Sequence, residues 1–219
     1  PYQEIYPDGI CRMEEHFFTK TLEFFDINYQ LAQNEDKTLI FENYCDFLNY
    51  FDSSIRVQLS FVNQMVDVEE YQKAIDIPEQ KDAFNSIRRE YVAMLKNQLA
   101  KGNNGLVKRK YITFGIQADS LKAAKLRLER IEADVLSNFK ALGVKACPLN
   151  GKERLALLHQ MMNGYDKRKF HFDWKEIAKT GMSTKDFIAP DSFCFQNKNR
   201  FQMGKTCGAV SFLQITAPE

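Results

Sequence analysis

Gly204-Lys205-Thr206 is the segment whose residue types come nearest to a known chemistry, the binding of nucleotide phosphates. A phosphate-binding loop ends in Gly-Lys-Ser/Thr and needs another glycine five residues before that Gly, with a strand in front and a helix behind. Asn199 stands at the position of that other glycine, and the residues after Thr206 have the alternating pattern of a strand. We therefore interpret the segment as a turn between strands, and we predict no cofactor-binding residue in this chain.

The histidines and carboxylates do not form a pattern that indicates a metal site or a catalytic site. Glu14-Glu15-His16 are adjacent, and adjacent side chains point to different sides of the chain, so they cannot converge on one ion. Neither His159 nor His171 has another histidine or a carboxylate four residues further on. Asp26 and Glu35-Asp36 fall at a strand end and a helix start, where acidic residues favour the helix N-terminus. We predict no metal ligand and no catalytic residue.

One run, Tyr165 to Phe172, mixes basic and aromatic residues in the way that single-strand binders do. Residues 108–110 and four basic residues of the helix predicted at 121–142 form another basic zone. Acidic residues in that same helix allow local ion pairing, so a solvated helix face explains the zone equally well. The net charge is only +1, which provides no long-range field for nucleic acid or anionic lipid. Binding of single-stranded DNA through residues 165–172 is therefore the alternative function.

Length and composition indicate a folded protein with one sizeable core. The chain has 219 residues, of which 44% are hydrophobic, and we expect one domain over 1–219, or two lobes at 1–150 and 151–219. No apolar run approaches the roughly 18 residues that span a bilayer, so we expect no membrane insertion. The five cysteines are scattered without ligand spacing, which is typical of reduced thiols in the cytoplasm.

Hydrophobic periodicity predicts strands that alternate with helices. The expected strands are 17–28, 55–61, 111–117, 144–147, 192–196 and 209–215, and the expected helices are 34–51, 78–102, 121–142, 152–162 and 173–179. Alternation over 55–61 predicts a strand with one buried face, and the helix at 78–102 carries an apolar stripe from Phe84 to Leu99. This order predicts an α/β (α+β) fold, in which helices pack on a mixed sheet built from ferredoxin-like β-α-β units, without a P-loop core.

Several stretches resemble one protein family. They are Tyr6-Pro7-Asp8-Gly9-Ile10, residues 26–37 (DINYQLAQNEDK) and residues 45–52 (CDFLNYFD), with weaker support at 110–114 and 201–213. In these stretches the chain is similar to the CagE/TrbE family of type IV secretion ATPases of conjugative elements, and among them to those of integrative elements in Gram-positive bacteria. The similarity extends over nearly the whole chain and is specific at the two longer stretches.

The resemblance implies a role without catalysis for this part of the protein. In the family the motor domain follows this region, so ATP and Mg are expected to bind beyond residue 219 and this fragment is not expected to be an enzyme. Both ends look cut, and we expect an N-terminal assembly domain of a longer ATPase. The resemblance further implies docking to inner-membrane subunits of the secretion channel and self-association, in the cytoplasm and peripheral to the inner face of the membrane.

Overall fold

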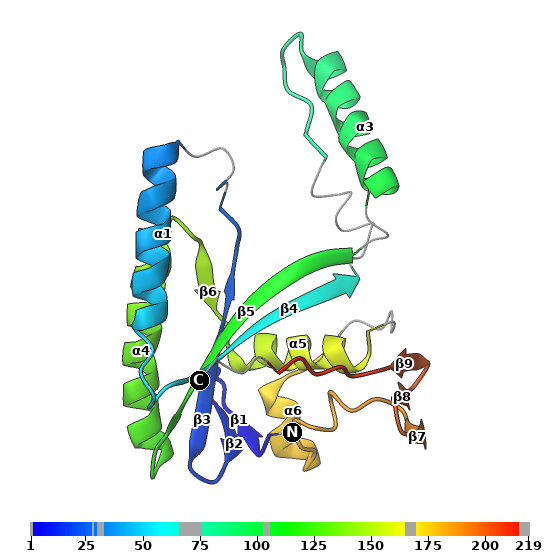
Figure 1. The fold of residues 1–219 in the computed structure, drawn as a ribbon. Helices are drawn as coiled ribbons and strands as arrows, with labels where there is room; N and C mark the ends of the chain where they lie inside the picture. The colour runs from blue at the N-terminus through cyan, green and yellow to red at the C-terminus, as the bar shows by residue number, and fades with distance from the viewer. Residues whose placement is uncertain are drawn as a thin grey trace. The chain divides into compact units, whose positions relative to one another are not determined.

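A computed structural model describes residues 2–27, 29, 33–65, 76–102, 106–164 and 170–214 (Figure 1). The chain forms two compact units, Pro1–Ser60 with Lys110–Glu219 and Phe61–Arg109. These units meet in the chain after residues 60 and 109, whereas the predicted lobes meet after residue 150.

A six-stranded sheet has most of its residues in the first unit. Its strands are β1 (Glu4–Ile5), β2 (Cys11–Glu14), β3 (Phe17–Phe24), β4 (Arg56–Met65), β5 (Leu106–Gln117) and β6 (Ala146–Pro148). They lie in the order β1-β2-β3-β5-β4, and β6 also pairs with β3. The α/β class is confirmed. The sheet was predicted to be mixed, but the strand pairs whose register is described are all antiparallel. They are β1 with β2, and β3 with β2, β5 and β6. The ferredoxin-like units stay a prediction.

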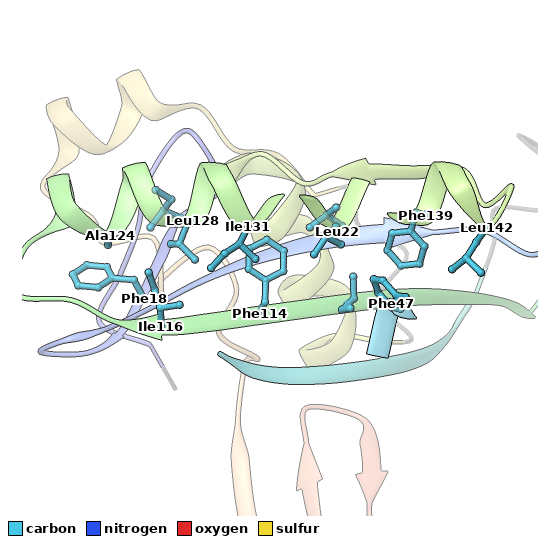
Figure 2. Packing of buried hydrophobic residues seen from close by; sticks show 13 residues of the cluster. Phe18, Leu22, Phe47, Phe114, Ile116, Ala124, Leu128, Ile131, Phe139 and Leu142 are labelled. Carbon is cyan, nitrogen blue, oxygen red and sulfur yellow. The ribbon is translucent and has the colours of Figure 1, made fainter. Parts of the chain in front are cut away.

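Helix α4 (Leu121–Ala141) covers one face of this sheet, as the sequence predicted. Its buried stripe consists of Ala124, Leu128, Ile131, Val135 and Phe139. The register places Phe18 opposite Ile116 and Leu22 opposite Ile112, and all four belong to the same buried cluster. Figure 2 shows Phe18 and Leu22 of β3 and Ile116 of β5 between the strands and the helix. Helix α1 (Asn34–Asn49) adds Phe47 to the same core.

Side chains alternate along a strand, so the other side chains of β3 point to the face opposite α4. This face packs against α5 (Gly151–Met162). Thr19 faces this side and contacts Arg154 of α5. A second apolar core forms here from Tyr2, Ile5, Cys11, Leu155, Phe172 and Ile188. Asn150 and Glu153 form a capping box that starts α5, and α6 (Trp174–Thr180) packs Trp174 against this core.

Strand β4 departs from the prediction of a buried face. Ile55, just before the strand, packs on the first core, but Val57, Leu59 and Phe61 are exposed. β4 lies at the end of the strand order and has a neighbouring strand on one side only. The first core is built from β3, β5, α1 and α4, so the apolar alternation of β4 remains uncovered by the described residues.

A separate three-stranded antiparallel sheet follows α6. It consists of β7 (Phe193–Asn197), β8 (Arg200–Met203) and β9 (Thr206–Gly208), which confirms the strand predicted at 192–196. The strand predicted at 209–215 is wrong over the described residues 209–214, which pair with no strand there.

The second unit contains α3 (Asn85–Gly102), which begins seven residues later than the helix predicted from residue 78. Asp82 accounts for this later start: its carboxylate accepts a hydrogen bond from the backbone N–H of Phe84 at 2.9 Å, closing a turn just before the helix.

Candidate functional site

The segment Gly204-Lys205-Thr206 forms the turn between β8 and β9, as predicted. Met203 pairs with Thr206 across this turn. The backbone N–H of Gly204 donates to the carbonyl of Ser192 at 2.8 Å, and the Gln202 amide donates to the carbonyl of Gly204 at 2.9 Å. A phosphate would need free amides at the start of a helix, whereas this turn leads into a strand and its first amide is already bonded.

Several of the histidines and acidic residues considered as ligands or catalytic groups have other local contacts. His171 is exposed and lies 3.6 Å from the carboxylate of Glu176, and the His159 ring packs against Phe170. Asp26 forms an ion pair with Lys110. Glu35 and Asp36 lie in the first turn of α1, where they were expected to favour the helix N-terminus. Among the residues that the structure describes, no three His, Cys, Asp or Glu residues gather as metal ligands would.

The structure describes only the last three residues of the basic and aromatic run at 165–172. Residues 165–169, with all three of its basic residues, lie outside the described part of the chain. Phe172 is fully buried, with its ring edge-on to those of Trp174 and Phe187, and Phe170 packs partly buried against the same core. Phe172 could not stack on a base without disrupting the second core, and binding of DNA by the rest of the run stays a prediction.

Two of the four basic residues of the zone on α4 have hydrogen-bond partners outside this helix. Lys125 donates to Asp8 at 2.8 Å, and Arg127 donates to the hydroxyl of Ser54 at 2.6 Å. Burial by itself would raise the pKa of Asp8, but hydrogen bonds from Lys125 and the backbone of Ile10 lower it overall. The Asp8 carboxylate offsets the charge of Lys125, which favours the interpretation of a solvated helix face, whereas the Ser54 hydroxyl leaves the charge of Arg127 in place.

Arg154 is a buried residue that the sequence analysis missed. Its guanidinium donates to the carbonyls of Gly9 and Thr19 at 3.0 and 2.9 Å and to the hydroxyl of Thr19 at 2.7 Å. Burial lowers the pKa of Arg154 from its ordinary value. A single arginine beside the apolar positions of a helix is the signal that could have indicated it. Arg154 joins α5 to the 6–10 turn and to β3.

The same turn requires glycine at position 9. Gly9 has a φ of +85°, and a Cβ there would lie 2.0 Å from the carbonyl oxygen of Leu149. The stretch Tyr6 to Ile10, which carries part of the family resemblance, is therefore held by backbone packing and by Arg154, and no described contact gives it a chemical role.

An exposed apolar stripe runs along α3 in the second unit. It consists of Phe84, just before the helix, and Ile87, Tyr91 and Met94, each 45–60% exposed. Arg88 pairs with Asp82, which lowers the pKa of Asp82 to about 2. Arg89 and Lys96 form ion pairs with acidic residues of the segment before the helix. The polar side of α3 thus has partners within its own unit, and the apolar stripe faces solvent.

A scan against protein-family models finds no match for this chain, and a search of curated protein sequences finds none either. In the described ranges, no helix is both long and apolar enough to cross a bilayer.

Proposed function

We propose that this chain is the non-catalytic N-terminal docking domain of a type IV secretion ATPase from a conjugative element. In this proposal it binds inner-membrane subunits of the secretion channel and sister copies, at the inner face of the cell membrane, while a following motor domain binds ATP and Mg. The class of the parent protein comes from the sequence resemblance. The docking role is supported by one observation, the exposed stripe of α3.

The stripe supports docking because the described residues of the second unit form no apolar core. Gln64 is the only buried residue among the side chains described between 61 and 109. Most of the stability of a protein helix such as α3 comes from packing of its apolar face. Four large apolar side chains at helical spacing, with the charged side already paired, fit the surface of a partner that covers the stripe.

Placing a charge in the stripe is expected to impair conjugation. Ile87→Asp in the parent protein should lower DNA transfer from the donor cell by at least about tenfold, since a charge buried at the centre of an interface costs more than about 1.4 kcal/mol. Transfer is measured by counting transconjugants, with protein levels checked by immunoblot. Ala93→Asp introduces the same charge at an exposed position of α3 off the stripe and should leave transfer unchanged. Normal transfer in the Ile87→Asp strain would contradict the docking role.

ATP is expected not to bind this chain at micromolar concentration. The turn at Gly204 leads into β9 and not into a helix. The backbone N–H of Gly204 already donates a hydrogen bond to the carbonyl of Ser192, so the turn lacks the free amides that hold phosphates. Calorimetric titration with Mg-ATP should give no heat of binding for the native chain or for Lys205→Ala. A micromolar Kd that disappears in Lys205→Ala would show instead that this chain holds the nucleotide.

A further inference from the structure

Three phenylalanine rings gather on one face of the β7–β9 sheet. Phe193 and Phe195 are two residues apart on β7, so they point to the same side. Their ring centroids lie 5.6 Å apart, and the ring of Phe201 on β8 lies 6.4 and 6.1 Å from them. Phe195 is 73% exposed and Phe193 is also exposed. The three rings contact one another, and Phe201 is half-buried, but Phe193 and Phe195 remain open to solvent, which is unusual for a cluster whose only role is packing.

Gly208 on β9 provides the space for this aromatic face. A Cβ at Gly208 would lie 2.5 and 2.7 Å from two carbon atoms of the Phe201 ring. The ring therefore lies directly against the backbone of the neighbouring strand, and Phe201 pairs with Gly208 in the register. Because glycine has no side chain, none at position 208 covers the Phe201 ring, and a surface for base stacking requires such an uncovered ring.

The charge of this sheet is entirely positive. Between Ser192 and Gly208 the chain has three basic residues and no acidic residue. Lys198, Arg200 and Lys205 are all exposed, and none forms an ion pair with another described residue. By contrast, Lys20 on β3 and Lys125 on α4 are paired with carboxylates. Unpaired cations beside exposed rings complement a polyanion.

We propose that the β7–β9 face binds single-stranded nucleic acid, with bases stacked on Phe193, Phe195 and Phe201 and phosphates paired with the three cations. Base stacking on exposed aromatic rings combined with Lys and Arg contacts is the usual physics of such binding. An anionic membrane fits less well, because the two turns carry Lys198-Asn199 and Gly204-Lys205. A hairpin that enters lipid would place apolar residues at its turns, whereas here the rings lie within strands.

The test is fluorescence anisotropy of the 219-residue chain with a labelled 20-nucleotide oligothymidine at 50 to 200 mM salt. We expect binding whose affinity falls with salt, and Phe195→Ala should weaken the Kd about tenfold. The triple variant Lys198→Gln, Arg200→Gln, Lys205→Gln should lower the slope of log affinity against log salt by about 2, since each phosphate contact on a single strand contributes about 0.7. Thermal unfolding followed by circular dichroism verifies that each variant is folded.

Matched controls separate this face from general charge and hydrophobicity. Phe41→Ala removes another exposed ring, on α1, and the triple variant Lys122→Gln, Lys152→Gln, Lys175→Gln removes three exposed lysines elsewhere. Both should bind the oligonucleotide as the native chain does. The proposal is overturned if the native chain does not bind at 50 mM salt, or if the test and control variants lose affinity equally. It is also overturned if phosphatidylglycerol vesicles bind through Phe195 and excess oligothymidine does not displace them.

Discussion

Phe114→Ala is expected to lower the free energy of unfolding by about 4 kcal/mol, because the ring is fully buried between the sheet and α4. Phe114 lies on β5 opposite Lys20 of β3, on the face that α4 covers (Figure 2). Truncation would leave a cavity lined by side chains from three elements, and these cannot all move in to fill it. The change is measured by urea denaturation followed by circular dichroism.

The same substitution at an exposed ring provides the control. Phe41 on α1 is 61% exposed, so Phe41→Ala should change the free energy of unfolding by no more than about 0.5 kcal/mol. If both variants lost equal stability, the Phe41 side of α1 would have to be buried in solution. The first core as described would then be incomplete.

Arg154→Met is expected to lower the free energy of unfolding by about 3 kcal/mol. Methionine fills much of the volume but leaves the carbonyls of Gly9 and Thr19 without the donor they have now. Each unsatisfied buried polar group costs about 1–3 kcal/mol, which outweighs the lower desolvation cost of a neutral side chain. Chemical denaturation of the variant and the native chain measures the difference.

Lys152→Met is the matched control for Arg154, because it removes a cation from an exposed position of the same helix. It should change stability by no more than about 0.5 kcal/mol. An Arg154→Met variant as stable as the native chain would mean that water or another donor reaches those carbonyls. The 6–10 turn would then not depend on the guanidinium.

The two units differ in what holds them together. In the first unit, two apolar cores on opposite faces of one sheet order α4 and α5, and Arg154 adds directional bonds between α5 and the sheet. The second unit lacks buried apolar side chains among its described residues, so its helix depends on local ion pairs and on propensity. A partner that covers α3 would therefore contribute stability as well as contact, which links the proposed docking role to folding.

The sequence by itself determined the features that depend on neighbouring residues. Helical periodicity predicts a helix at 121–142, and α4 runs from Leu121 to Ala141 with a buried apolar stripe and with Ser120 as its N-cap. The turn at Gly204 follows from a motif that lacks the glycine and the helix that a phosphate loop needs. Periodicity, caps and turns are local properties, so the residue pattern is sufficient to predict them.

Only the tertiary structure decided which apolar faces are covered. Periodicity shows that β4 and α3 each have an apolar side, but whether another element packs on that side depends on residues far away in the chain. The same holds for Phe172, which looked like part of a basic binding run and lies in a core, and for Arg154, whose acceptors are 135 and 145 residues away. Burial is decided by contacts between distant segments, and spacing along the chain does not contain that information.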